Sequence, residues 1–232
     1  YNFTNSLESN TLIEEAAAQS VLIDGLAATG QVTFSTLVID SRNDAGIEIN
    51  DLAGSVRFLD DVTMLALSGG AAAGLSVSGS QADSSIRFSD LLSITNSGGR
   101  GIELINSQAD SLFSVQGQTA VTDATLESIF MDGIDGTVEL GDFVTIENRL
   151  DRGLVMQNSN GDFSVSGATF IGNALGSATT ALDIQNSEAN VTFNILQILD
   201  AEGVAGSPAG VNLVGNLAGA TNTALHTYGL ID

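Results

Sequence analysis

A six-residue pattern of apolar and polar positions recurs eight times along the chain. Its second and fourth positions are apolar, and the third position between them is mixed and more often polar. Alternation with a period of two is typical of a strand that buries one face. Successive copies begin 26, 28, 27, 27, 25, 28 and 29 residues apart, which predicts one structural unit that tolerates changes in loop length. The copies begin at Ser20, Gly46, Gly74, Gly101, Ser128, Gly153, Ala181 and Gly210.

The sixth position of the pattern holds only glycine, asparagine or aspartate. These residues adopt positive φ most readily. Such a restriction in every copy predicts a tight left-handed corner that ends the strand at the same point of each unit. This corner column comprises Gly25, Asp51, Gly79, Asn106, Gly133, Asn158, Asn186 and Gly215.

Two more short strands are predicted in each unit after the corner. The inward position of the second strand is apolar in every unit, and so is that of the third, in a chain that is 43% apolar. The second-strand column comprises Leu7, Phe34, Phe58, Phe88, Val115, Leu140, Val165 and Phe193. The third-strand column comprises Ile13, Ile39, Met64, Ile94, Val121, Ile146, Ile171 and Ile198.

Three short strands per unit cannot bury their inner faces alone, but stacked units can. The sequence therefore predicts an all-β fold, a right-handed single-stranded parallel β-helix of about eight three-strand rungs with about 27 residues per rung. The whole chain, 1–232, forms one domain in this interpretation, and Phe34, Phe58 and Phe88 stack inside it. A leucine-rich repeat would need a helix in each unit, and only 14–19 could be helical. A β-sandwich would not produce one corner column.

Both ends of the pattern stop within a unit, without a recognisable cap. The segment 11–13 begins the chain's third-strand column, while Leu225 and Ile231 extend two columns into a ninth, incomplete rung. An open β-helix end exposes unpaired backbone groups and core side chains, which folded proteins normally cover. We therefore expect either end-to-end stacking of copies or neighbouring repeats of a longer chain.

The net charge of the chain limits the classes of molecule that it is expected to bind. The chain carries 28 acidic residues, six arginines and no lysine, for a net charge of −22, and it has no cysteine. Such a surface repels nucleic acid and anionic lipid headgroups. No apolar segment is long and uninterrupted enough to span a membrane, so membrane insertion is not expected.

Candidate catalytic groups are few, and we do not expect an enzyme. The only histidine, His226, lies in the terminal unit, and the acid pairs Asp60-Asp61 and Glu14-Glu15 are more typical of turns or solvated edges. No cofactor is expected. Calcium is the one ion for which a candidate site exists, although no known calcium-loop spacing is present: Asp132, Asp135, Glu139 and Asp142.

Outward positions of the strands carry polar residues. Glu48, Glu103 and Asp183 share the third position of the repeated pattern, which a solvated face explains most simply. The outward position of the second strand is too varied for the flat threonine ladder of an ice-binding face. It is occupied by Thr33, Arg57, Arg87, Ser114, Glu139, Ser164 and Thr192.

The corner column, the aliphatic strand columns and the acidic, cysteine-free composition resemble the β-helical repeat regions of bacterial surface proteins. Autotransporter passengers, filamentous-haemagglutinin-like adhesins and giant repeat adhesins are of this kind, and the resemblance covers 7–213. It implies an exported structural or adhesive rod at the cell surface. The alternative is a carbohydrate-binding or carbohydrate-active β-helix that uses the loops 65–74, 172–181 and 199–210 to bind surface glycans.

Overall fold

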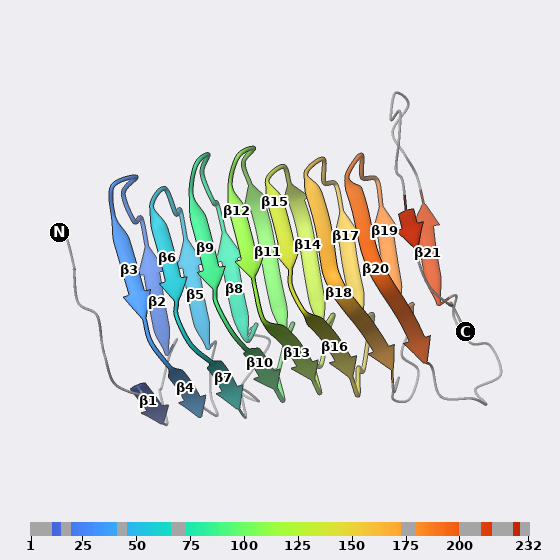
Figure 1. The fold of residues 1–232 in the computed structure, drawn as a ribbon, viewed down its shortest axis with the longest axis horizontal. Coiled ribbons are helices and arrows are strands. Elements are labelled where there is room, and N and C mark those ends of the chain that lie inside the picture. Colours follow the sequence, from blue (N-terminus) through green and yellow to red (C-terminus); the bar gives the residue numbers. More distant parts are fainter. Residues whose placement is uncertain are drawn as a thin grey trace.

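Parallel strands coil into a solenoid in which each turn lies on the preceding one (Figure 1). The computed structural model describes residues 11–14, 20–40, 46–65, 73–172, 180–199, 210–214 and 225–227. All regular secondary structure in these residues is β-strand, and they include no helix long and apolar enough to cross a membrane. The parallel β-helix expected from the repeat is confirmed.

The first strands of the units form an eight-stranded parallel sheet, here called the small sheet. Each strand pairs with the first strand of the next unit, so the order in the sheet follows the chain. The strands are β2 (Val21–Asp24), β5 (Ile47–Asn50), β8 (Leu75–Ser78), β11 (Ile102–Ser107), β14 (Ile129–Ile134), β17 (Leu154–Gln157), β19 (Leu182–Gln185) and β21 (Val211–Val214).

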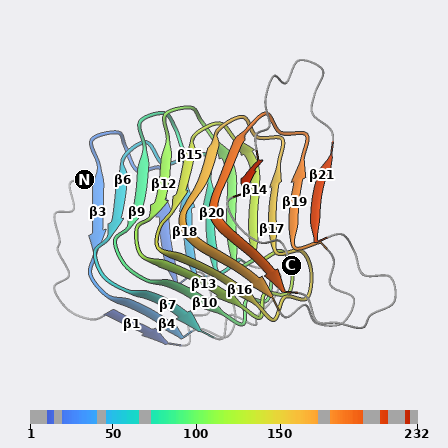
Figure 2. The same ribbon diagram turned by 45° about the vertical axis from the view of Figure 1, so that its right-hand side comes forward.

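The second and third strands form two columns that join into one fourteen-stranded sheet, here called the large sheet (Figure 2). They join because β18 (Asp162–Gly172) and β20 (Asn190–Leu199) each run through both columns, with a register shift between Val165 and Ala168. The second-strand column contains β3 (Gln31–Phe34), β6 (Ser55–Phe58), β9 (Ser85–Phe88), β12 (Leu112–Val115), β15 (Thr137–Leu140) and β22 (Leu225–Thr227). The third-strand column contains β1 (Thr11–Glu14), β4 (Leu37–Asp40), β7 (Val62–Leu65), β10 (Leu92–Thr95), β13 (Gln118–Thr122) and β16 (Phe143–Glu147).

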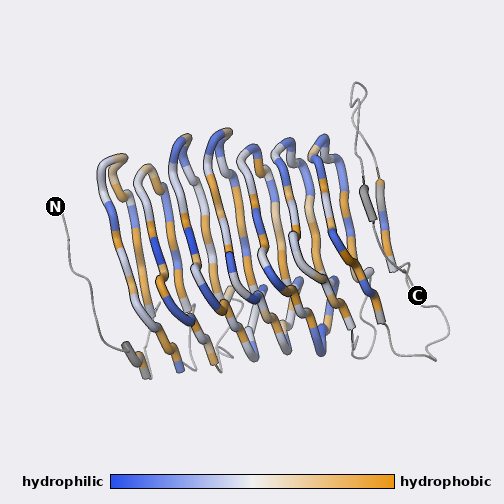
Figure 3. Tube along the Cα trace, viewed as in Figure 1, coloured by the Kyte–Doolittle hydropathy of each residue, from blue (hydrophilic) through white to orange (hydrophobic). Residues whose placement is uncertain are grey.

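The predicted inward columns stack in register and form the core. Ile47 pairs with Leu75, which pairs with Ile102, and every inward residue of the small sheet from Ile47 to Ile184 is at most 4% exposed. The alternation of apolar and polar residues is visible along the coil in Figure 3. Stacking of the rungs thus buries the inward apolar side chains, which a single rung would leave exposed.

The predicted aromatic stack is present inside the second-strand column. The rings of Phe34 and Phe58 lie 5.0 Å apart between centroids and 9° from parallel, and those of Phe58 and Phe88 lie 4.3 Å apart and 5° from parallel. Phe113 continues the stack with a tilted ring, 5.8 Å from Phe88. Identical side chains at one position of successive rungs therefore contact one another directly.

The corner column adopts the predicted left-handed conformation. Its seven described members, Gly25 to Asn186, have φ between 48° and 69°. Gly215 and Leu7 lie outside the described residues, as do Ile231 and most of the possible helical segment 14–19. A second set of positive-φ residues follows the third strand, at Asn96, Asp123 and Asn148, and the sequence pattern did not predict it.

Two details of the stacking differ from the prediction. The coil makes about six turns, slightly fewer than the predicted eight rungs, at the predicted length of about 27 residues per turn. In β22, Leu225 pairs with Val191, and Thr227 pairs with Phe193. The prediction placed Leu225 on Phe193, so the true register differs by two residues. A two-residue shift keeps the same face inward, so alternation alone cannot detect it.

In the first described rung, inward side chains of β2 and β3 are less buried than their counterparts in later rungs, whereas Leu37 and Ile39 of β4, which pairs with β1, are fully buried. Val21, Val32 and Phe34 are half-buried, whereas Phe58 is fully buried. Among the described strands of the small sheet, β2 pairs only with β5, and β21 pairs only with β19.

Candidate functional site

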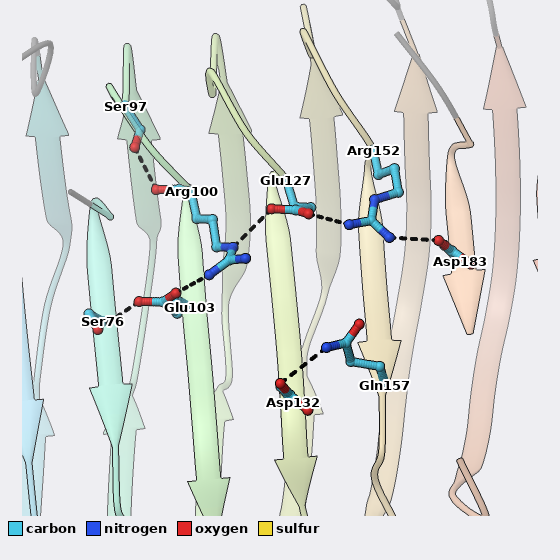
Figure 4. Close-up of polar contacts among 9 residues, drawn as sticks. All are labelled: Ser76, Ser97, Arg100, Glu103, Glu127, Asp132, Arg152, Gln157 and Asp183. Atoms are coloured by element: carbon cyan, nitrogen blue, oxygen red, sulfur yellow. Dashed lines mark hydrogen bonds and ion pairs between the residues drawn. The ribbon is translucent and has the colours of Figure 1, made fainter. Parts of the chain in front are cut away.

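Charged side chains form a continuous ladder across the outer face of the small sheet (Figure 4). Arg100, Glu127 and Arg152 occupy equivalent positions, two residues before β11, β14 and β17. Arg100 Nε lies 2.9 Å from Glu127 Oε2, and Arg152 Nη1 lies 2.8 Å from Asp183 Oδ2. Arg100 also contacts Glu103, and Arg152 contacts Glu127. We call these five residues the charge ladder.

Neutral side chains hydrogen-bond both ends of the charge ladder. Ser76 Oγ donates to Glu103 Oε2 at 3.1 Å, and Asn212 Nδ2 donates to Asp183 Oδ1 at 2.8 Å. Gln185 Nε2 donates to the other Asp183 oxygen, also at 2.8 Å. These contacts link strands from β8 to β21 on one face of the sheet.

Burial and ion pairing act in opposite directions on the ladder carboxylates. The side chains of Glu127 and Asp183 are only 6% and 4% exposed. Burial raises the pKa of Glu127, but hydrogen bonds from Arg100, its own backbone and Arg152 outweigh this and leave the pKa lowered. Burial also raises the pKa of Asp183, but hydrogen bonds from Arg152, Gln185 and Asn212 outweigh this effect and leave the pKa lowered. Both carboxylates are therefore ionised at neutral pH.

The expectation that Glu103 and Asp183 lie on a solvated face is wrong. The same outward column places Phe130 and Val155 between them, and these two residues are 5% and 0% exposed. The guanidinium carbon of Arg100 lies 3.6 Å from the centroid of the Phe130 ring, a cation–π contact. The arginines can bridge acids that are three rungs apart because another acid, Glu127, lies between them.

The four acids of the predicted calcium site do not come together. Asp132 lies on β14 and accepts hydrogen bonds from Gln157 and Asn158, at 3.1 and 2.9 Å. Glu139 belongs to β15 in the other sheet, so the two carboxylates are on different walls of the solenoid. Within the described ranges, no group of three acidic or histidine residues could hold a metal ion.

The remaining candidates from the sequence are dispersed. Asp60 and Asp61 are exposed between β6 and β7, as expected for a turn. Glu14 ends β1, and Glu15 lies outside the described residues. His226 is in β22, where its backbone pairs with Thr192. Most of the loops 65–74, 172–181 and 199–210 lies outside the described residues, so their role stays a prediction.

A shallow depression of about 470 Å³ lies on the large sheet, where the second strands turn into the third. Its polar lining residues are Ser114, Gln116, Glu139, Ser164 and Ser166, and Val115, Leu140 and Gly141 complete the wall. Gly141 and Gly167 occupy this turn, where an added Cβ would collide with the carbonyl oxygen of the preceding rung. The close backbone approach therefore requires glycine at both positions.

Comparisons with protein-family models, curated proteins and solved structures found no match. The resemblance to bacterial adhesins therefore stays a prediction, and the parallel solenoid itself is what the structure supports. The charge ladder was missed from sequence, although Arg100, Glu127 and Arg152 recur 27 and 25 residues apart, with alternating charge, immediately before three copies of the pattern.

Proposed function

We propose that the chain is a structural module of an extracellular β-helical rod, and that its terminal rungs stack on further rungs. These rungs would belong to another copy or to neighbouring repeats of a longer chain. The observation that carries the proposal is the half-burial of Val21, Val32 and Phe34 in the first described rung, where the described strands β2 and β3 pair only with the next rung. Apolar side chains at a sheet edge favour the addition of another strand.

The two edges of the small sheet are complementary. Val21 N donates to the carbonyl of Gly46, so the alternation of the strand turns the N–H and C=O of Leu22 toward the opposite, outer edge. At the other end, Leu182 N donates to the Gly210 carbonyl, and the same pattern leaves the Val211 N–H for a following rung. Stacking one end on the other would therefore continue the existing hydrogen-bond ladder as a head-to-tail contact.

Charge favours growth along the axis over lateral clustering. A net charge of −22 makes the sides of two copies repel each other. The described part of the core that is least covered is at the end of the stack. We infer that end-to-end assembly strengthens as salt screens the repulsion, which acts over about 8 Å at physiological ionic strength.

The test is a change at the outer edge of β2. Leu22 is 54% exposed, and Leu22→Pro removes its outward N–H while leaving the donors toward β5 in place. Leu22→Thr removes the same apolar side chain and keeps the N–H, so it is the matched control. Sedimentation velocity and negative-stain imaging of the wild type at high protein concentration should show rods.

The proline variant should shorten these rods or abolish them, and the threonine variant should retain most of the assembly. Wild-type protein that stays monomeric at high concentration and moderate salt would contradict stacking between copies. Equal loss in both variants would show that the side chain, and not strand addition, drives association.

A further inference from the structure

Two arginines lie side by side on the outer face of the large sheet. Arg57 of β6 and Arg87 of β9 pair in register. Like charges directly opposite each other destabilise a sheet. Within the described part of the chain, neither guanidinium makes an ion pair or a side-chain hydrogen bond, in contrast to Arg100 and Arg152. The described contacts of Arg57 and Arg87 therefore give no structural reason for placing the two arginines side by side.

The pair stands out because positive charge is rare in this chain. Only six residues are basic, against 28 acidic ones. Two of the six nevertheless occupy adjacent rungs of one column, and no carboxylate of the described residues pairs with them. Two guanidinium groups at strand spacing, about 4.8 Å apart at their backbones, provide several N–H donors for one planar anion.

The polar depression continues the same column of outward residues. Arg87 pairs with Ser114, Ser114 with Glu139, and Glu139 with Ser164. Ser114, Glu139 and Ser164 line the depression together with Gln116. A ligand that lies along the rod axis would thus meet the arginines first and then hydroxyl, amide and carboxylate groups.

This order of groups selects the chemistry of the ligand. Glu139 lies two rungs beyond Arg87, so a second anionic group at that point would be repelled. A polymer with a charge on every unit, such as nucleic acid, fits poorly. Sugar hydroxyls fit well, because a carboxylate accepts and serine and glutamine side chains both donate and accept. The matching ligand has one anion at one end and neutral, hydroxyl-rich units after it.

We propose that Arg57 and Arg87 bind the carboxylate of one acidic sugar, and that the neutral sugars next to it in the same oligosaccharide lie over Gln116, Glu139 and Ser164. Ser114, which is only 3% exposed, lies beneath this path. This site is distinct from the loops 65–74, 172–181 and 199–210, and it does not depend on end-to-end stacking. It would make the side of the rod a glycan-binding surface.

The test uses two acidic probes with the same neutral part. Sialyl-lactose carries a carboxylate on a nonulosonic acid, and lactose capped with glucuronate carries it on a uronic acid; lactose and heparin are the neutral and polyanionic comparisons. Binding is followed by isothermal titration and by NMR shifts of the second-strand column. We expect at least one acidic probe to bind about tenfold or more tightly than lactose and heparin, and which of the two binds better identifies the acid.

Variants separate a built site from general electrostatics. Arg57→Gln with Arg87→Gln should weaken binding of the acidic probe by about tenfold or more. Gln81→Glu with Gln197→Glu changes the net charge by the same −2 at two exposed positions outside the proposed site and should change affinity less than about twofold. Arg57→Lys with Arg87→Lys keeps the charge and should give an intermediate loss, because lysine lacks the planar fork.

Glu139→Gln gives the sharpest contrast. If charge alone attracted the ligand, removal of this carboxylate would strengthen binding; the proposed contact with sugar hydroxyls predicts weaker binding, by about threefold. Melting curves confirm that each variant is folded. The proposal is overturned if neither acidic probe binds better than lactose, if heparin binds as tightly as they do, or if the control pair loses as much affinity as the arginine pair.

Discussion

The left-handed corner of each turn can be tested at Asn106, in the middle of the stack. Its φ is 54°, a region that residues with a Cβ adopt at a cost and β-branched residues adopt least readily. Asn106→Val keeps the side-chain size similar but introduces the branch. Asn106→Gly removes the Cβ and with it the steric penalty.

The expected magnitude follows from the backbone. A left-handed conformation costs an L-residue about 1–2 kcal/mol, and asparagine is enriched there because it bears less of this cost. Valine should therefore destabilise the protein by about 1–2 kcal/mol. For a chain of this size, that lowers the melting temperature by about 2–8 °C. Glycine should be close to neutral, because the relieved strain offsets about 0.5–1 kcal/mol of extra unfolded-state entropy.

The assay is thermal and urea unfolding followed by circular dichroism, with Asn194→Val as the control. Asn194 is exposed in β20 and is not among the residues with positive φ, and valine suits a strand. We expect the control to be neutral or slightly stabilising. If valine at 106 costs no more than valine at 194, the corner does not impose the conformation, and the reasoning from the Gly/Asn/Asp column fails.

Three further outcomes are expected. Because pairing lowers the pKa values of Glu127 and Asp183, the stability they contribute is present at neutral pH and is lost as the pH falls below about 4, which urea midpoints measured against pH should show. Glu127→Gln should lower the free energy of unfolding at neutral pH by about 1–3 kcal/mol and make it depend less on pH in the acid range. Phe58→Ala should lower the free energy of unfolding in urea by about 3–5 kcal/mol, and Phe34→Ala should lower it clearly less, because Phe58 is fully buried between two rings and Phe34 is half-buried beside one. Equal losses in the two variants would contradict the aromatic stack. Calcium or a chelator should leave the melting temperature unchanged, because the four candidate acids are not gathered, and a rise with calcium would show that another site exists.

The core and the first corner could be predicted from the sequence because both repeat at one position of every unit. Burial demands an apolar residue such as Ile47 on each rung, and a positive φ demands a residue such as Asn106. These constraints act on each unit separately, so eight copies reinforce the same signal. The second corner, at Asn96, Asp123 and Asn148, follows the third strand. These positions lie two residues after the third-strand column, but the same spacing leads to Ser41 and Ala66 in two other units, so the column is not restricted to glycine, asparagine and aspartate.

The charge ladder and the arginine pair depend on contacts between rungs, which the repeat does not fix. Arg100, Glu127 and Arg152 recur in only three units, so they look like ordinary surface charges until their side chains are seen to meet across Phe130. Arg57 and Arg87 could be placed on neighbouring rungs from the sequence. That neither pairs with a carboxylate of the described residues is visible only in the folded structure.

The chain has no native cysteine, so a pair of introduced cysteines reports the stacking directly. Thr63 and Ser93 face each other in register on β7 and β10, while Ala120 lies one rung further, opposite Ser93. A disulfide needs Cα atoms within about 7 Å; neighbouring strands satisfy this, and residues two rungs apart, at about 10 Å, do not. The stacked solenoid predicts that Thr63→Cys with Ser93→Cys oxidises to an intramolecular disulfide, whereas Thr63→Cys with Ala120→Cys keeps free thiols under the same conditions. Efficient closure of the second pair, or failure of the first in folded protein, would contradict the stacking of positions about 27 residues apart.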